Sequence, residues 1–220
     1  MKKVVIFGAG AFAQVARVYL TKDAGHEVVA YTVDPEHIGT RKLDGLDVVS
    51  FECLLEAFPP ADYALFVAIG FRKVNRARAD VFRRCRDLGY ELVSYVSSKA
   101  VSWDEPKVGA NCFILENNVI QPFVTIGDNV VLWSGNHIGH HVTIGDHCFI
   151  SSHVVISGGV HVGDHTFIGV NATVRDHLTI GPANVIGAGA LILEDTPDGA
   201  VYAPKGTERS PVPSHRLRGF

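Results

Sequence analysis

Residues 138–163 read IGHHVTIGDHCFISSHVVISGGVHVG, and every sixth residue of this stretch, beginning at Ile138, is an isoleucine or a valine. Counting in sixes from Val96 to Ile192 gives seventeen positions, of which all but Ser102 are aliphatic. Glycine follows the aliphatic residue at positions 109, 127, 139, 145, 163, 169, 181 and 187. Neither a strand, with its period of two, nor a helix, with its period of 3.6, produces this pattern over about 100 residues.

A fixed period of six predicts a parallel β-helix, in which each coil has three short faces. The aliphatic residues fill the triangular interior, and the residue four places after each of them is mostly small, as at Cys112 and Ala172. The position three places after the aliphatic residue is a turn that requires left-handed backbone, where histidine is enriched. We interpret the five histidines in this slot as turn residues rather than metal ligands: His141, His147, His153, His165 and His177.

Residues 1–93 follow a different pattern, in which apolar strands alternate with helical stretches. The strand VVIFGAG (residues 4–10) precedes a helix that begins near Ala11, and further strands are expected within residues 26–34 and 62–70. The segment 73–89 predicts a second long helix. This alternation indicates a parallel sheet, which binds ligands at the carboxyl ends of its strands.

Several residues at these strand ends are candidates for binding a nucleotide. Gly8, Gly10 and Ala13 match a G-x-G-x-x-G/A turn, in which backbone N–H groups and a helix N-terminus approach phosphates. Asp34 ends the second strand, where a carboxylate can accept hydrogen bonds from a ribose or a base. Basic residues that follow Gly70 could neutralise a diphosphate: Arg72, Lys73, Arg76 and Arg78. A tight turn without a ligand and a solvated helix face remain the alternatives.

Composition limits the possible partners and the compartment. The 220 residues are 47% hydrophobic and carry a formal net charge of −3, which gives no electrostatic reason to expect nucleic acid. No signal peptide and no apolar run near 18 residues is recognisable, and the four cysteines have no C-x-x-C spacing. We therefore expect a cytoplasmic protein with buried thiols that binds a small ligand and no membrane.

His140 differs from the other histidines because it lies two places after the aliphatic residue, in a slot that points outward at a corner of the coil. The residue one coil later is Gly158, so we expect the space beside the imidazole to be empty of side chains. A neutral imidazole, with a reference pKa near 6.5, can accept a proton from a nucleophile at cellular pH. His140 is therefore a candidate general base.

The stretch SGNHIGHHVTIGD (residues 134–146) resembles the hexapeptide-repeat acyltransferases, in particular the bacterial N-acetyltransferases that modify UDP-, dTDP- or GDP-linked 4-amino-4,6-dideoxyhexoses. The resemblance covers nearly the whole chain and includes an A-P-K triplet at residues 203–205. It implies a Rossmann-like nucleotide-sugar-binding domain over residues 1–93 and a left-handed β-helix over 94–197. It also implies a tail, residues 198–220, near the adenine end of CoA.

The resemblance also implies roles for individual residues. It makes His140 the base and the Gly158 N–H the donor to the oxyanion. Residues implied to bind the nucleotide sugar are Gly8, Gly10, Ala11, Phe12, Asp34, Gly70 and Ser134. Residues implied to line the CoA groove are Phe149, Gly158, Val170, Ala188, Ala203 and Lys205. The residue after the base is an acid in some relatives and is His141 here, so the partner that orients the imidazole stays open.

The predicted activity is transfer of an acetyl group from acetyl-CoA to the amino group of a nucleotide-linked amino sugar, for bacterial surface glycan biosynthesis. The resemblance implies a homotrimer with active sites at the subunit interfaces, and no metal. Three alternatives remain. They are O-acetyl transfer of the sialic-acid type, a γ-class-like zinc carbonic anhydrase, and a non-catalytic trimeric binding module.

Overall fold

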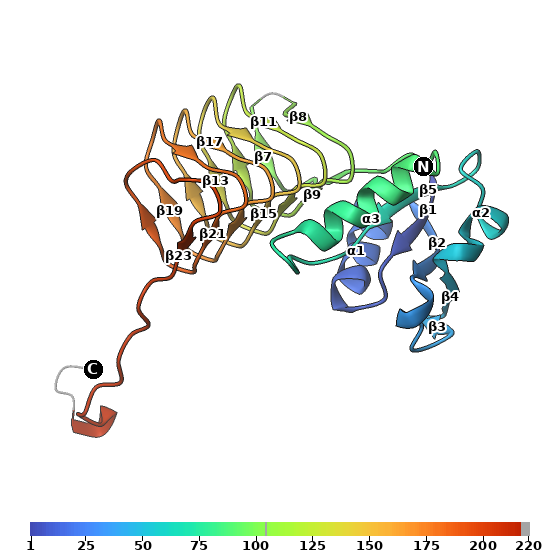
Figure 1. The fold of residues 1–220 in the computed structure, drawn as a ribbon, viewed down its shortest axis with the longest axis horizontal. Helices are drawn as coiled ribbons and strands as arrows, with labels where there is room; N and C mark the ends of the chain where they lie inside the picture. Colours follow the sequence, from blue (N-terminus) through green and yellow to red (C-terminus); the bar gives the residue numbers. More distant parts are fainter. Residues whose placement is uncertain (104, 217–220) are drawn as a thin grey trace.

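A computed structural model describes residues 1–103 and 105–216 and contains an N-terminal α/β part followed by a parallel β-helix (Figure 1). The N-terminal part is a five-stranded sheet with the order β3-β4-β2-β1-β5. Four of its strands are parallel, and short β3 pairs antiparallel with β4. The strands are β1 (Lys3–Phe7), β2 (Glu27–Val33), β3 (Lys42–Leu43), β4 (Leu46–Ser50) and β5 (Ala64–Val67).

Helices cover both faces of this sheet. Val4 and Ile6 of β1 pack on the side of α1 (Ala11–Lys22), whereas Val5 and Phe7 face the side of α3 (Arg76–Asp87). Shorter helical segments are α2 (Leu54–Ala57), η1 (Pro35–His37), η2 (Phe51–Cys53) and η3 (Ser214–Arg216). The parallel strands and the helix after β1 agree with the pattern expected from the sequence.

The second long helix begins later than the sequence predicts. Lys73, Val74 and Asn75 have left-handed φ values of 55°, 51° and 62°, so α3 starts at Arg76 instead of residue 73. Left-handed backbone is unfavourable for a β-branched residue such as Val74. Hydrogen bonds of the Asn75 side chain offset the cost of this left-handed backbone, because its Nδ2 donates to the carbonyl oxygens of His165 and Thr166 in the β-helix.

The β-helix is built from three parallel sheets, whose paired strands lie 18 residues apart except at the last pair of sheet I, where Val185 pairs with Val201. Sheet I contains β6 (Tyr95–Val96), β9 (Phe113–Ile114), β12 (Val131–Leu132), β15 (Phe149–Ile150), β18 (Phe167–Ile168), β21 (Val185–Ile186) and β23 (Val201–Tyr202). Sheet II contains β7 (Val101–Ser102), β10 (Val119–Ile120), β13 (His137–Ile138), β16 (Val155–Ile156), β19 (Thr173–Val174) and β22 (Leu191–Ile192). Sheet III contains β8 (Lys107–Val108), β11 (Thr125–Ile126), β14 (Thr143–Ile144), β17 (His161–Val162) and β20 (Thr179–Ile180).

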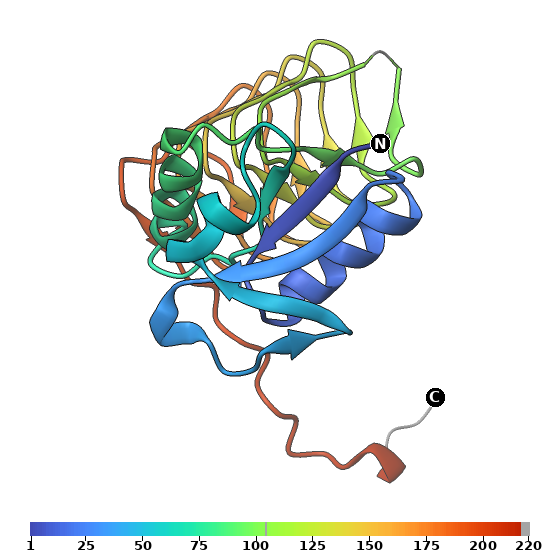
Figure 2. The same cartoon turned by 90° about the vertical axis from the view of Figure 1, so that its right-hand side faces the viewer.

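The three sheets meet at three edges, which we name by the sheets they join: edge I–II, edge II–III and edge III–I. Figure 2 shows the coils stacked behind the N-terminal sheet. The hexad aliphatic residues and the small residues after them form one buried core along the axis, from Cys112 to Ile192. These features fit a left-handed parallel β-helix with hexapeptide repeats and confirm the interpretation of the six-residue period.

The turn histidines also lie as expected. His141, His147, His153, His165 and His177 all have φ values between 57° and 62°. Buried Cys85, Cys112 and Cys148 match the expectation of buried thiols, and burial raises the pKa of each to about 12. Cys53 does not match, because its residue is exposed.

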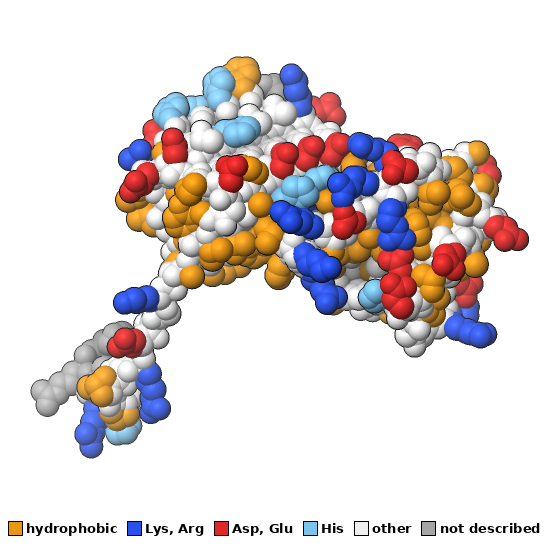
Figure 3. Space-filling view, in the orientation of Figure 1, with side chains coloured by type: hydrophobic (Ala, Val, Ile, Leu, Met, Phe, Trp, Pro, Cys, Tyr) orange, Lys and Arg blue, Asp and Glu red, His pale blue; other side chains and the backbone are white. Residues whose placement is uncertain are grey.

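The N-terminal part and the β-helix share a hydrophobic core. Outward residues of sheet I, including Phe113 and Val131, belong to the same buried cluster as Val4, Ile6 and Leu20. Figure 3 shows hydrophobic side chains on the underside of the β-helix, next to the N-terminal part. The interface therefore fixes the position of the N-terminal strand ends relative to the coils.

A buried arginine strengthens this interface. Arg78 of α3 is 0% exposed, and its guanidinium donates to the carbonyl oxygens of Asn129, His147 and Cys148, at 2.8–3.3 Å. Desolvation lowers the pKa of Arg78 to about 10. Its burial corrects the expectation that Arg78 could neutralise a diphosphate, whereas Arg72, Lys73 and Arg76 are exposed.

Candidate active site

The predicted site residues divide between two edges of the β-helix and the strand ends of the N-terminal part. His140 and Gly158 lie on edge II–III, and Ser134, Val170 and Ala188 lie on edge I–II. Six residues separate the equivalent positions of neighbouring edges, a span of at most about 20 Å. Sheet II lies between the two groups, so one chain does not bring them together.

His140 and Gly158 are direct neighbours. A Cβ built on Gly158 would lie 2.6 Å from both Cε1 and Nε2 of His140, so the imidazole occupies the position that a side chain at 158 would need. This confirms that they are adjacent and corrects one detail, because the ring itself fills the space over the glycine. His140 is exposed, and Figure 3 shows histidine side chains gathered along the upper edge of the β-helix.

The backbone N–H of Gly158 has no hydrogen-bond acceptor among the described residues. The equivalent N–H groups on edge III–I are occupied, because Ala110 and Asp128 each donate to an aspartate one coil later, at 2.8 and 2.7 Å. The N–H of His140 also has an acceptor, Oε1 of Gln121, at 2.8 Å. Gly158 therefore presents a donor next to an imidazole, an arrangement suited to a developing oxyanion.

His141 contacts His140 directly. The two Nδ1 atoms lie 3.2 Å apart, and the rings are nearly perpendicular, at 85°. Phe123, one coil earlier, packs against the His141 ring with a centroid distance of 4.6 Å. The sequence did not identify the residue that orients the His140 imidazole. The contact between His140 and His141 depends on side-chain directions that the repeat pattern does not specify.

The residues on edge I–II form a column of small or apolar side chains. Ser134 Oγ donates to Oε1 of Glu116, at 2.7 Å, and Tyr19 of α1 donates to Oε2 of the same carboxylate, at 2.8 Å. Val170 and Ala188 are exposed further along this edge. The column continues into the tail, because Tyr202 pairs with Ile186 and the Tyr202 carbonyl accepts the Gly187 N–H.

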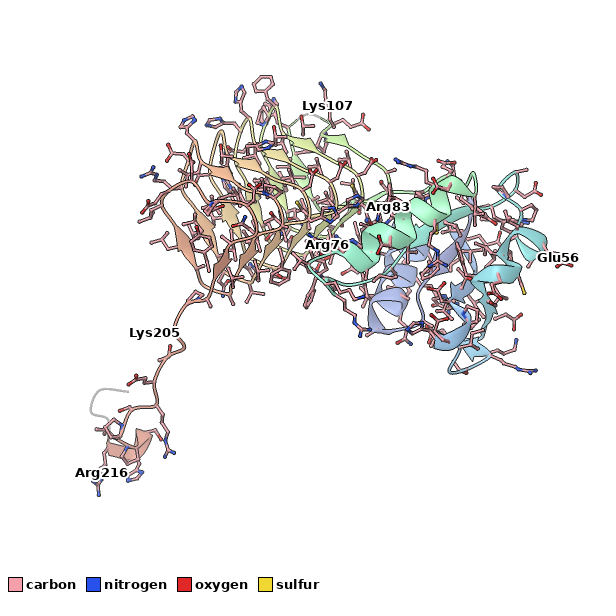
Figure 4. All side chains as sticks on the ribbon, in the orientation of Figure 1. Glu56, Arg76, Arg83, Lys107, Lys205 and Arg216 are labelled. Atoms are coloured by element: carbon pink, nitrogen blue, oxygen red, sulfur yellow. The ribbon has the colours of Figure 1, made fainter. Side chains whose placement is uncertain are left out.

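Ala203 and Lys205 are exposed on the segment that leaves the β-helix after β23, and Figure 4 shows Lys205 on this segment. The tail projects away from the coils of its own chain (Figure 1). Its first residues nevertheless lie at the end of edge I–II, since Ala203 and Pro204 approach the position of a Cβ on Gly187.

Phe149 does not lie on an open groove. Phe149 is only 4% exposed. Its ring centroid lies 5.1 Å from that of Phe71 and 5.8 Å from that of Phe167, and the ring also contacts the guanidinium of Arg78. The outward position of β15 is covered by the N-terminal part, which the hexapeptide pattern does not show. The expectation that Phe149 lines the CoA groove is therefore wrong for its side chain.

The strand ends of the N-terminal part leave space for a ligand at three predicted residues. No atom lies within 4 Å of the position that a Cβ would take on Gly10 or on Gly70, and Ala11 is exposed in the first turn of α1. Gly8 has a structural role, because its φ is +126° and a Cβ there would lie 2.8 Å from the Ala68 carbonyl oxygen. The first turn of α1 has no acidic residue and no side-chain cap, so its N–H groups face the space beside Gly10.

Two other predicted nucleotide contacts are already engaged. The Phe12 ring packs edge-to-face on Phe113, with centroids 5.5 Å apart, which leaves its backbone and not its ring for a ligand. The Asp34 carboxylate forms a two-point ion pair with Arg84 of α3, and that guanidinium lies 4.5 Å from the centroid of the Phe51 ring. The side chains of both residues are therefore engaged within the protein, and their binding of a nucleotide stays a prediction.

Among the described residues, potential metal-ligating groups gather in one cluster, formed by Asp34, Glu36 and His37. It lies on the N-terminal part, and its aspartate is the one paired with Arg84. The histidines of edge II–III are not part of it. Within the same described ranges, no helix is long and apolar enough to span a membrane.

Similarity to known proteins is found in both sequence and structure. The family model described as bacterial transferase hexapeptide (six repeats) matches residues 105–139 and 125–158. A mutant of perosamine N-acetyltransferase from Caulobacter crescentus, solved with CoA and GDP-perosamine, is 30% identical with a TM-score of 0.82, and the match covers 91% of this chain and 93% of that one. No curated protein sequence gives a significant match.

Two further solved structures support the fold. The acetyltransferase domain of PglB from Neisseria gonorrhoeae, in complex with acetyl coenzyme A, is 24% identical with a TM-score of 0.80, and the match covers 91% of this chain and 95% of that one. WeeI from Acinetobacter baumannii is 21% identical with a TM-score of 0.71, and the match covers 91% of this chain and 96% of that one.

Proposed function

Because the chain belongs to the family of bacterial nucleotide-sugar N-acetyltransferases built on hexapeptide repeats, we propose that it transfers the acetyl group of acetyl-CoA to the amino group of a nucleotide-linked amino sugar. The observation that carries the proposal is the pairing of an exposed imidazole with an unoccupied backbone N–H, at His140 and Gly158. An acetyl transfer needs a base for the amine and a donor for the oxyanion, and this edge offers both.

The proposed reaction uses His140 first as a base and then as an acid. The unprotonated amine attacks the thioester carbonyl carbon, the new C–N bond forms, and the carbonyl oxygen becomes an oxyanion that the Gly158 N–H stabilises. His140 Nε2 accepts the proton that the nitrogen loses. When the intermediate collapses, the C–S bond breaks, and the imidazolium gives its proton to the departing thiolate to yield free CoA and the amide.

The amino sugar is proposed to reach this edge from the strand ends of the N-terminal part. We assign a Rossmann-like role to this part, with the diphosphate at the N-terminus of α1 beside Gly8, Gly10, Ala11 and Gly70. The matched perosamine N-acetyltransferase binds GDP-perosamine. We therefore propose a nucleotide-linked 4-amino-4,6-dideoxyhexose as the substrate class, with Ser134 near the sugar. Since acetyl-CoA is a metabolite of the cytoplasm, we expect the enzyme to act there.

We further propose a homotrimer in which each site forms between two subunits. Four of the six outward residues of sheet II are apolar, and these four are 37–62% exposed: Val101, Val119, Val155 and Leu191. His137 and Thr173 lie between them, so the face is largely apolar. The outward residues of sheet III are instead polar: Lys107, Thr125, Thr143, His161 and Thr179. Edges I–II and II–III border this face on either side. Packing the face against other copies would therefore bring edge I–II of one subunit beside edge II–III of the next. This arrangement supports a CoA path on one subunit next to the partner subunit's His140, with the path lined by Val170, Ala188, Ala203 and Lys205.

The proposed function is tested by measuring thiol release from acetyl-CoA with a panel of UDP-, dTDP- and GDP-linked amino sugars, with mass spectrometry of the product. We expect one class of amino sugar to gain an acetyl group on nitrogen. His140→Ala should lower kcat by about 100-fold or more, because general-base catalysis contributes that much. Acetylation of a sugar hydroxyl instead would favour the O-acetyltransferase alternative, and no thiol release with any acceptor would contradict the proposal.

A further inference from the structure

His140 and His141 form a side-chain pair whose geometry restricts both tautomers. Their Nδ1 atoms are 3.2 Å apart. A neutral imidazole carries a hydrogen on one nitrogen and a lone pair on the other, so a hydrogen bond between these two atoms requires one donor and one acceptor. The tautomer of one ring therefore determines the tautomer of the other.

Other contacts fix the position of His141. Its φ of 58° belongs to the left-handed turn slot, which sets the direction of the side chain. Its ring packs against Phe123 with the two planes tilted by 37°, and Phe123 occupies the same slot one coil earlier and is 72% exposed. The exposed phenyl ring thus packs against the same imidazole that contacts His140.

The two ring nitrogens of His140 lie in different surroundings. Its backbone N–H donates to Gln121, and its Nε2 lies over Gly158 while its Nδ1 faces His141. Nε2 is thus the nitrogen at the proposed reaction site. To accept a proton there, the neutral ring must carry its hydrogen on Nδ1.

We propose that His141 is a positioning residue, whose Nδ1 accepts the Nδ1–H of His140 and so keeps the lone pair of His140 on Nε2, toward the substrate amine. The inference rests on the proposed function and deepens it. The neutral imidazole of His141 fixes the tautomer of His140 without adding a negative charge beside it. The imidazolium formed at His140 is therefore stabilised less than it would be beside a carboxylate, which favours its return of the proton to the thiolate.

Few charged groups besides His141 face His140 from the same edge. Arg175, Asp176 and His177 lie two coils later, and Glu105 lies about two coils earlier, each at a separation of roughly 10 Å. At such separations exposed charges are largely screened at physiological salt. The ring of His141 is thus the titratable side chain in direct contact with His140 on this edge of the described chain.

Two substitutions test the pair. His141→Gly keeps the left-handed turn, because glycine occupies the same slot at 159, but removes the ring. We expect kcat to fall by about 10-fold or more while the KM values of both substrates stay unchanged. His141→Asp replaces the neutral acceptor by a carboxylate, which stabilises the imidazolium, so the acidic limb of the pH profile of kcat should move up by about one pH unit.

His177→Gly is the matched control, because His177 occupies the same slot on edge II–III and its ring lies over Gly159, away from His140. It should keep the wild-type kcat and pH profile. Wild-type kcat in His141→Gly, an unmoved acidic limb in His141→Asp, or a rise in KM without a fall in kcat would each overturn the proposal.

A second measurement does not depend on activity. Nitrogen NMR of labelled histidine should show the Nδ1–H tautomer of neutral His140 in the wild-type protein and a mixture of tautomers in His141→Gly. An unchanged tautomer would overturn the positioning role. If the wild-type protein acetylates no amino sugar, the proposed function fails, and this spectrum still decides whether His141 fixes His140.

Discussion

At the scale of single residues, the candidate site depends on the absence of a side chain at position 158. The imidazole of His140 lies where a Cβ of residue 158 would be, so only glycine allows the ring to rest against the backbone. The N–H of residue 158 has no acceptor among the described residues, whereas the equivalent N–H groups on edge III–I donate to an aspartate one coil later. Residue 158 therefore offers both space for the proposed base and the N–H of the proposed oxyanion donor.

We predict that Gly158→Ala lowers kcat without unfolding the protein. The φ of residue 158 is not left-handed, so alanine fits the backbone, but its methyl group would lie 2.6 Å from the His140 ring and must displace it. A displaced base should lower kcat by about 10-fold or more. Steady-state kinetics and a thermal melt check this, with Ser157→Ala in the same turn as a control; an unchanged kcat would contradict the proposed geometry.

At the scale of elements, the left-handed turn slots of edge III–I form a docking ladder for the N-terminal part, made of Asn111, Asn129, His147 and His165. Asn111 bonds to both backbone polar groups of Val67 in β5, and its Nδ2 donates to Asn129 at 2.8 Å. Asn129 in turn contacts Nδ1 of His147 at 2.9 Å, and His147 lies against Phe82 of α3. Figure 4 shows Arg76 and Arg83 on α3, next to the β-helix.

The docking ladder should make the stability of the protein depend on pH. Desolvation, and then the charge of His165, lowers the pKa of His147 to about 4, below its ordinary value near 6.5. Since the folded state binds this proton more weakly, the contribution of neutral His147 is complete above about pH 6.5 and is lost as the pH falls toward 4. The other groups near the ring are Asp146, Asp164 and Arg78.

We predict that His147→Asn reduces this acid sensitivity, because asparagine continues the amide contacts of the ladder and does not titrate. Urea unfolding at pH 7.5 and pH 5 should show a smaller loss of unfolding free energy in the variant than in the wild-type protein. His153→Asn is the control, since His153 occupies the same turn slot on edge I–II and is exposed. Equal losses in all three proteins would exclude His147 as the cause.

At the scale of the whole molecule, the distribution of apolar surface indicates which face the proposed trimer would bury. Sheet I is largely covered by the N-terminal part, and sheet III is polar outside, which leaves the largely apolar outer face of sheet II. The predicted CoA path and the predicted base border this face from opposite sides. A subunit interface at this face would bring the CoA path of one subunit next to the predicted base of another.

We predict that Val155→Glu separates the proposed trimer and abolishes acetyl transfer while leaving each chain folded, because it places a charge in the middle of the largely apolar face. Light scattering should change from about three times 23.8 kDa to the mass of one chain. Thr143→Glu, on exposed sheet III, should remain trimeric and active. A trimeric and fully active Val155→Glu protein would contradict the shared site.

The sequence alone determined the β-helix, its turn slots and the adjacency of His140 and Gly158. These follow from a strict period, since any two residues 18 positions apart must be vertical neighbours, as Phe149 and Phe167 are. Only the tertiary structure decided which outward faces are covered. Phe149, Phe12 and Arg78 were expected near ligands, but they lie in the interface between the two parts, because docking of the N-terminal part depends on contacts that no local spacing encodes. The contact of His141 with His140 was likewise decided by side-chain directions and by packing against Phe123, which a repeat leaves undetermined.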